Sequence, residues 1–197
     1  MSSGAGQEMG TAGSAERGTA GSAAASVGVA TADDMRALGQ RLAGLLHPGD
    51  LVVLSGPLGA GKTTLAAGIG RGLNVRGPVT SPTFVIARVH PPLSGGPALV
   101  HADAYRLASP AEVDDLDLDA DVSSSVTVVE WGEGLVEGLA ADRLDISIAI
   151  SRTAGPGSPA GLEAGRRTVR ISGVGERWAA GAMESVRCAL PPASEAL

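Results

Sequence analysis

The 197-residue sequence predicts an α/β protein with a central, mostly parallel sheet, helices on both faces and an antiparallel portion. Three observations predict this class. Short apolar runs at residues 51–55 and 126–130 are typical of strands that a parallel sheet buries on both faces. Segments with helical periodicity alternate with the strand-like runs. Hydrophobic residues form 44% of the chain and aromatic residues only 2%, so the core must consist mainly of Val, Leu, Ile and Ala.

The first third of the chain is predicted to contain a tail, two strands and two helices. Residues 1–25 have low complexity and cannot bury enough apolar surface to offset chain entropy, so we expect a disordered tail. Residues 26–30 are a short strand, and the capping box at 31–34 opens a helix. The apolar face of this helix comprises Met35, Leu38, Leu42 and Leu45. A turn at 48–50 precedes the strand 51–55.

The remaining elements are predicted from apolar periodicity and turn residues. A second helix begins near Lys62, with Leu65, Ile69 and Leu73 on its apolar face. The later strands are expected at 84–90, 98–103, 126–130, 144–150 and 168–172, the first two as a hairpin. Helices are expected to start at 109–112 and to fill 176–190. The acidic stretch 112–121 is interpreted as a solvated helix and turn, with a metal site as the less favoured alternative because it lacks the ligand pattern of a calcium loop. Residues 26–190 then form one domain, 155–165 a Gly/Pro-rich loop and 191–197 a tail.

A glycine-rich motif follows the strand 51–55 directly. Residues 56–63 read Gly-Pro-Leu-Gly-Ala-Gly-Lys-Thr, the G-x-x-x-x-G-K-T pattern of a P-loop, and strand, loop and helix are the context that this motif requires. Glycines let backbone N–H groups converge on a phosphate, and the following helix points its N-terminus at the same anion. The predicted nucleotide-binding residues are Gly56, Gly59, Ala60, Gly61, Lys62, Thr63 and Thr64. The sequence therefore predicts a P-loop NTPase fold, with a plain glycine turn before a helix as the alternative.

Lys62 is the single lysine of the chain, beside fourteen arginines. An ammonium is a compact charge that fits between phosphates and loop carbonyls, which the bulky guanidinium does not. We expect Lys62 to reach the β- and γ-phosphates and the Thr63 hydroxyl to ligate Mg²⁺. Asp103 and Glu130 each end an apolar run and are candidates to complete the metal site, with ordinary solvent-facing acids as the alternative. Trp131 is expected either in the core or at the mouth of the nucleotide site.

Composition excludes several other classes. A formal charge of −6 argues against a broad basic surface that holds nucleic acid directly. Cys188 is the only cysteine, so no intramolecular disulfide is possible. No stretch resembles a signal peptide or approaches the roughly 20 apolar residues of a membrane span, so we expect a soluble, cytoplasmic protein without a membrane partner.

Four sequence blocks together resemble one family. They are residues 56–64, the Thr-Ser-Pro-Thr-Phe block at 80–84, the His-Ala-Asp-Ala-Tyr-Arg-Leu block at 101–107 and the Glu-Trp-Gly-Glu block at 130–133. In this order and spacing they resemble the TsaE family (formerly YjeE), over roughly residues 26–175. The members of that family are bacterial ATPases needed for threonylcarbamoyladenosine (t6A) modification of tRNA at position 37.

The resemblance implies ATP and Mg²⁺ as cofactors and Lys62, Asp103 and Glu130 as catalytic residues, with Thr63, Asp103 and Glu130 around the metal. Thr83 would lie in a switch-like loop that senses the γ-phosphate. The implied partner is the TsaB–TsaD heterodimer, whose turnover ATP hydrolysis supports, so that tRNA is reached only indirectly. Pro57 stands where the family often has Asp, a change that spares the phosphate and metal groups.

Two other functions fit a P-loop of this size. A small-molecule kinase would need an acceptor pocket and an arginine-bearing lid, for which residues 152–167 are the candidate. A non-catalytic scaffold would bind nucleotide as a structural ligand, and retention of both acids argues against it. Screening of phosphoryl acceptors and hydrolysis by a Glu130→Ala variant separate these hypotheses from a partner-stimulated ATPase.

Overall fold

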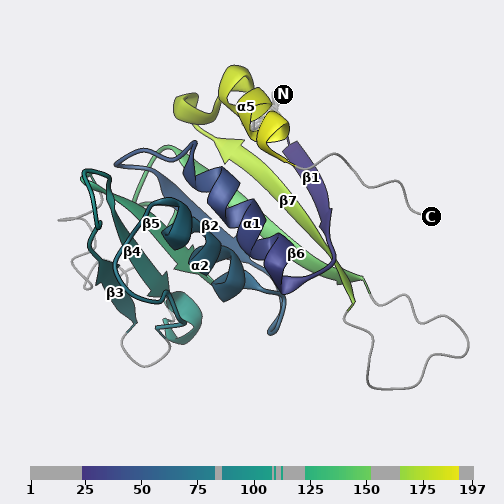
Figure 1. Cartoon of the computed structure of the whole chain (residues 1–197), viewed down its shortest axis with the longest axis horizontal. Helices are drawn as coiled ribbons and strands as arrows, with labels where there is room; N and C mark the ends of the chain where they lie inside the picture. Colours follow the sequence, from purple (N-terminus) through teal and green to yellow (C-terminus); the bar gives the residue numbers. More distant parts are fainter. Residues whose placement is uncertain are drawn as a thin grey trace, which may run out of the picture.

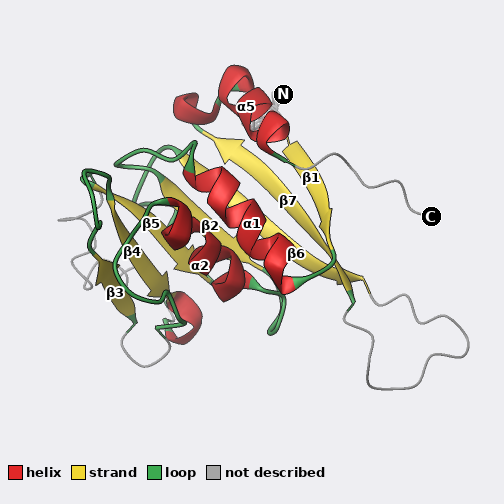
Figure 2. Ribbon diagram, viewed as in Figure 1, coloured by secondary structure: helices red, strands yellow, loops and turns green. Residues whose placement is uncertain are grey.

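A seven-stranded mixed sheet forms the centre of the protein (Figures 1 and 2). The computed structural model describes residues 24–82, 86–107, 109, 112, 123–151 and 165–190. The strands are β1 (Ala24–Val29), β2 (Leu51–Ser55), β3 (Ala87–His90), β4 (Ala98–Asp103), β5 (Ser125–Glu130), β6 (Arg143–Ser151) and β7 (Arg166–Val174). Their order across the sheet is β1-β7-β6-β2-β5-β4-β3.

The centre of the sheet is parallel and both of its sides are antiparallel. Strand β2 pairs in parallel with β5 and β6, and β5 pairs in parallel with β4. Strands β1 and β7 are antiparallel additions at one side, and β3 forms an antiparallel hairpin with β4 at the other. The predicted antiparallel portion is confirmed, whereas the predicted parallel pairing holds only for the centre of the sheet, since three of the six pairings among the described strands are antiparallel. Because β2, β4 and β5 run in the same direction, their carboxyl ends meet at one edge of the sheet.

Three α-helices occur within the described residues: α1 (Ala32–Ala43), α2 (Lys62–Gly72) and α5 (Ala180–Ala189). The predicted capping box opens α1, since Thr31 Oγ1 accepts from the Asp34 N–H and Asp34 Oδ2 accepts from the Thr31 N–H, each at 3.0 Å. Helix α1 packs closely on α2 because a glycine faces the contact. A Cβ at Gly39 would lie 2.5 Å from the Leu65 carbonyl oxygen. Helix α2 is thereby fixed immediately behind the glycine loop.

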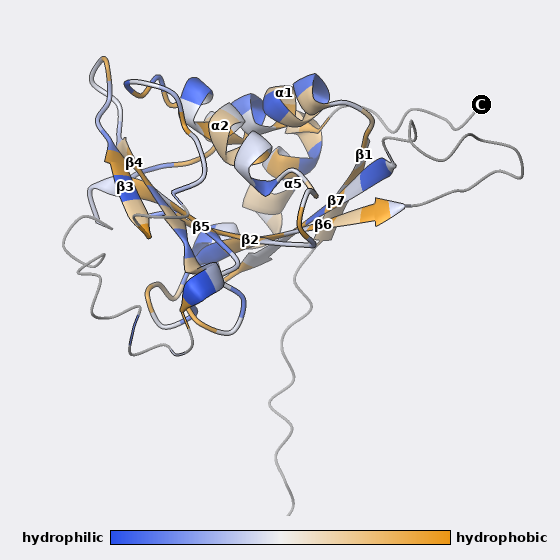
Figure 3. Ribbon diagram, turned by 90° about the horizontal axis from the view of Figure 1, so that it is seen from below, coloured by the Kyte–Doolittle hydropathy of each residue, from blue (hydrophilic) through white to orange (hydrophobic). Residues whose placement is uncertain are grey.

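All three of these helices lie on the same face of the sheet (Figure 3). They cover a large core that contains Leu54, Val128 and Ile146 from the central strands. The opposite face carries a smaller core, to which the segment after β5 contributes Val136. Within the described residues the turns at 131–140 help to cover this face, and the expected helical segment at 109–121 lies almost entirely outside them, so helices on both faces stay a prediction.

Several predicted boundaries shift. Strand β1 begins at Ala24, so residues 24–25 belong to the sheet rather than to the tail. Of the strand expected at 84–90, residues 84–85 lie outside the described residues, Ile86 adopts φ +65° and β3 begins at Ala87. The helix expected at 176–190 is divided into the 3-10 helix η2 (Glu176–Trp178) and α5, with Ala179 extended between them. Residues 1–23, 113–122, 152–164 and 191–197 lie outside the described residues, and so does the expected helix start at 109–112 apart from Ser109 and Glu112.

Candidate functional site

The glycine loop connects β2 to α2 at the carboxyl edge of the sheet. Gly56, Gly59 and Gly61 adopt φ values of +136°, +76° and +108°, which side chains with a Cβ rarely allow. A Cβ at Gly56 would also meet the backbone of Ile148. The strand, glycine loop and helix that the motif requires are therefore all present, and the loop backbone depends on its glycines.

Lys62 is the first residue of α2 and is only 4% exposed. Its Nζ donates to the carbonyl oxygens of Gly56 at 2.8 Å and Pro57 at 3.1 Å. The ammonium also lies 3.6 Å from the centre of the Trp131 ring, within the range of a cation–π contact. Burial lowers the pKa of Lys62, and the nearby Glu130 and Asp103 carboxylates partly offset that effect. An anion bound in the loop would stabilise this charge further.

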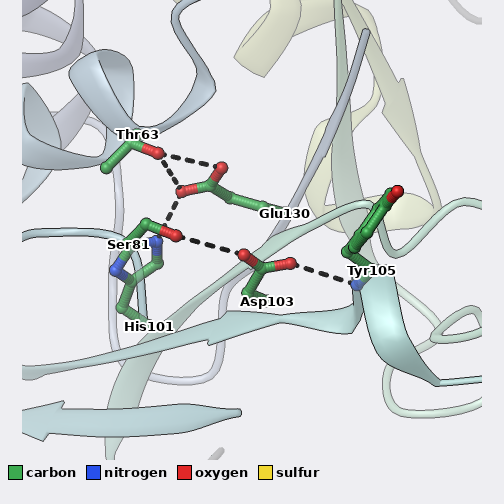
Figure 4. A network of polar contacts seen from close by, with 6 residues as sticks. All are labelled: Thr63, Ser81, His101, Asp103, Tyr105 and Glu130. Atoms are coloured by element: carbon green, nitrogen blue, oxygen red, sulfur yellow. Dashed lines mark hydrogen bonds and ion pairs between the residues drawn. The ribbon is translucent and has the colours of Figure 1, made fainter. Parts of the chain in front are cut away.

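Glu130 is held by two side chains (Figure 4). It ends β5 and is 3% exposed. Thr63 Oγ1 donates to Glu130 Oε1 at 2.8 Å and lies 3.1 Å from Oε2, and His101 Nε2 lies 3.0 Å from the same Oε1. A carboxylate oxygen accepts, so the imidazole Nε2 is the donor of that bond. His101 is therefore a buried hydrogen-bond partner of Glu130 and contributes to the site as well as to the core.

Asp103 stands opposite Glu130 in the register of β4 and β5. Its Oδ2 accepts from Ser81 Oγ and its Oδ1 accepts from the Tyr105 N–H, both at 3.1 Å (Figure 4). The two predicted carboxylates are therefore neighbours at one edge, and neither is an ordinary acid that faces solvent. Oxygen ligands from Thr63, Asp103 and Glu130 suit a hard divalent cation such as Mg²⁺.

Trp131 has φ +60°, the left-handed region that is uncommon for a residue with a large side chain. Its N–H donates to the Leu54 carbonyl at 2.9 Å, so β5 stays paired with β2 up to this residue. The ring packs against Tyr105 with centroids 5.3 Å apart. Trp131 is expected from sequence either in the core or at the mouth of the nucleotide site, and the structure places it at the mouth.

These groups surround one cavity of about 450 Å³. Its lining comprises Leu58, Gly59, Gly61, Lys62, Thr63, Thr64, Ser81, Asp103, Tyr105, Glu130 and Trp131. Two members of the predicted set lie outside this lining: Ala60 is buried, and Gly56 offers its carbonyl to Lys62. Thr83 lies outside the described residues.

Reasoning from residue patterns missed the cavity roles of Ser81, Tyr105 and Leu58. The first two belong to the blocks that carry the family resemblance, which was the only available signal for them. Leu58, at the tip of the loop, is 89% exposed, and a variable position of the motif gives no signal.

The fold and the cavity define a class of protein. It is an α/β protein in which a strand, a glycine loop and a helix bring one ammonium, several hydroxyls and two carboxylates to one cavity. A family model described as "Threonylcarbamoyl adenosine biosynthesis protein TsaE" matches residues 29–155. The chain belongs to the TsaE family, whose members take part in the biosynthesis of threonylcarbamoyladenosine in tRNA.

Known relatives agree with this assignment. A Streptomyces coelicolor tRNA threonylcarbamoyladenosine biosynthesis protein TsaE is 60% identical over 148 residues, which cover 74% of this chain and 94% of the relative. A Mycobacterium tuberculosis protein of the same name is 54% identical over 59% of this chain and 73% of its own length. The crystal structure of YdiB from Bacillus subtilis superposes with a TM-score of 0.63 at 25% identity, covering 85% of this chain and 97% of YdiB. Within the described residues, no helix is long and apolar enough to cross a membrane.

Proposed function

We propose that this chain is a Mg²⁺-dependent ATPase of the t6A37 tRNA modification machinery that works with the TsaB–TsaD heterodimer. The observation that carries the proposal is the meeting of Lys62, Thr63, Asp103 and Glu130 in one cavity at the N-terminus of α2. That helix end offers free N–H groups to an anion, and the ammonium adds a full charge. Membership of the TsaE family supports the tRNA modification as the setting of this activity.

The donor set at the sheet edge fits a magnesium ion. Thr63 Oγ1 and a Glu130 oxygen lie 2.8 Å apart, and Asp103 is next to Glu130 in register, so three oxygen donors converge. This is the pattern expected for Mg²⁺ at a nucleotide, which takes one or two protein carboxylates and completes its shell with phosphate oxygens and water. When bound, the ion would neutralise charge on the phosphates.

The roles of the side chains follow from phosphoryl transfer, which depends mostly on positioning and on charge neutralisation. Lys62 would stabilise the negative charge that develops on the transferred group. Asp103 and Glu130 are the cavity groups that can accept a hydrogen bond from an attacking water. His101 holds Glu130 Oε1, so Oε2, which lies 3.1 Å from Thr63 Oγ1, is the Glu130 oxygen that would serve a bound metal ion or water.

A partner is proposed to accelerate hydrolysis because the cavity is poor in positive charge. Among the described residues that line it, Lys62 is the only cation beside two carboxylates. Lys62 alone is expected to support slow hydrolysis, and docking of the TsaB–TsaD heterodimer is expected to increase the rate. Contact with tRNA would belong to those partners, in agreement with a formal charge of −6.

Calorimetry and turnover assays test the two halves of the proposal separately. Titration of the protein with ATP, with and without Mg²⁺, is expected to show magnesium-dependent binding that Thr63→Val weakens. Thr168 alternates along β7 with Arg167 and Val169 and therefore faces away from the loop, so Thr168→Val is the matched control and is expected to bind as the natural protein does. Absence of magnesium-dependent ATP binding would overturn the proposal that the chain is an ATPase. Equal hydrolysis rates with and without the TsaB–TsaD heterodimer would overturn the proposal that this partner accelerates hydrolysis.

A further inference from the structure

Arg167 connects β7 to the glycine loop across more than a hundred residues of sequence. Alternate residues of β7 face the helices, and the next two on this side, Val169 and Ile171, are fully buried. Arg167 lies on the same face of β7 but beyond the end of the core, so its guanidinium contacts the glycine loop. Its Nε donates to the Ala60 carbonyl at 3.0 Å, its second terminal nitrogen lies 3.5 Å from the Gly59 carbonyl, and its first donates to Gly165 at 3.3 Å.

The Ala60 carbonyl and the Gly61 N–H belong to the same planar peptide unit. A donor that fixes the oxygen on the outer side of the loop therefore also fixes the direction of the N–H on the inner side. The Gly59 carbonyl belongs to the same peptide unit as the Ala60 N–H, which donates to the Pro57 carbonyl at 3.1 Å and so closes the turn of the loop. Since the carbonyl of Ala60 accepts from a charged group, its peptide is polarised and its N–H becomes a stronger donor.

The guanidinium also brings positive charge close to the glycine loop. A Cβ built at Gly61 would lie 3.9 Å from Arg167 Nε, so the cation lies directly behind this loop residue. The cavity lining itself has one ammonium against two carboxylates among the described residues. Arg167 therefore supplies a second, permanently charged cation next to the site from outside its lining.

We propose that Arg167 is a positioning residue of the phosphate-binding loop: it holds the Ala60–Gly61 peptide in the orientation that binds phosphate and adds positive potential there. The proposal rests on the proposed function, since it assigns a role in ATP binding. An arginine that only closed the end of the core would affect folding stability and leave the affinity of the folded protein for ATP unchanged. Affinity and loop order are therefore the decisive measurements.

The experiment compares the natural protein with Arg167→Gln, Arg167→Lys and Arg170→Gln. Arg170 is exposed on the same strand and faces the opposite way, so it is the matched control for loss of one charge. Calorimetry with MgATP is expected to show about ten-fold weaker binding for Arg167→Gln, the size of one charge-assisted hydrogen bond. Arg167→Lys keeps the charge but not the fork of donors, so it is expected to recover part of the loss. Arg170→Gln is expected to bind normally.

A second measurement does not need nucleotide. Amide hydrogen exchange of Gly61 in the nucleotide-free protein is expected to be faster in Arg167→Gln than in the natural protein or in Arg170→Gln. Equal MgATP affinity and equal Gly61 exchange in Arg167→Gln and the natural protein overturn the inference, and so does an equal loss in Arg170→Gln. If Arg167→Gln fails to fold, Arg167→Lys decides by the same two readouts at an unchanged melting temperature. If the natural protein binds no MgATP, the proposed function fails, whereas Gly61 exchange still tests the anchor.

Discussion

Replacement of Gly39 by alanine tests how closely the two helices behind the site are packed. A Cβ at this position would lie 2.5 Å from Leu65 O, 2.7 Å from Ile69 N and 2.8 Å from Gly68 Cα. All three atoms belong to the backbone of α2, so no side chain can rotate away. The helices must separate by nearly 1 Å to restore an ordinary contact of 3.4 Å.

Overpacking of this kind costs about 1–3 kcal/mol, and the rigid backbone contact favours the upper end of that range. Alanine regains about 1 kcal/mol of helix propensity over glycine. We therefore expect Gly39→Ala to lower the free energy of unfolding by about 2 kcal/mol, or the melting temperature by about 4–8 °C for a domain of this size. Urea unfolding followed by circular dichroism measures the first quantity.

Gly181→Ala provides the matched control, because Gly181 lies in α5 and a Cβ there has no atom within 4 Å. It is expected to be as stable as the natural protein or slightly more stable. A Gly39→Ala protein at least as stable as the natural protein would refute the packing argument. Because Lys62 and Thr63 begin α2, the same displacement should also weaken MgATP binding.

Three further predictions concern the site. Burial lowers the pKa of Lys62, so between that lowered pKa and the usual 10.5 the unfolded chain binds more protons than the folded one. The free energy of unfolding should therefore rise with pH across this window. Lys62→Met should remove the rise in urea unfolding at different pH values, and a rise that persists in this variant would contradict the lowered pKa of Lys62. Trp131 becomes the only tryptophan in Trp178→Phe, and its fluorescence should change when MgATP draws the Lys62 ammonium from the ring, whereas an unchanged spectrum at saturation argues against this movement. Glu130→Gln keeps an acceptor for Thr63 but loses the charge, so ATP turnover should fall by at least about 100-fold; turnover at the natural rate would exclude a catalytic role for this acid.

Much of the fold could be predicted from local patterns. The buried parallel strands at 51–55 and 126–130 appear as apolar runs, and β6 and β7 appear through alternation. The order of the strands could not be predicted, because the insertion of β7 between β1 and β6 depends on pairing between distant segments. The division of the last helix was missed for a similar reason: Trp178 is buried, and the preceding Arg177 donates to the Leu45 carbonyl. Tertiary contacts there override a helical sequence pattern.

The candidate site divides in the same way. The glycine loop and Lys62 lie in one continuous motif, so their grouping follows from sequence. Asp103 and Glu130 could be proposed because each ends an apolar run, and only the parallel register of β4 and β5 makes them neighbours. Arg167 resembles any arginine on a surface strand, since its partners lie more than a hundred residues away. Contacts of that range leave no periodicity or spacing for a single sequence to display.

The burial of the only lysine has a practical consequence. An endoproteinase that cleaves after lysine has a single target bond, which lies at the start of α2 behind a side chain that is 4% exposed. Cleavage there requires local opening of the glycine loop and the first turn of the helix. The rate at which this protease divides the chain into two fragments would therefore record how often the loop opens, without any label, and would serve for comparing variants and ligands.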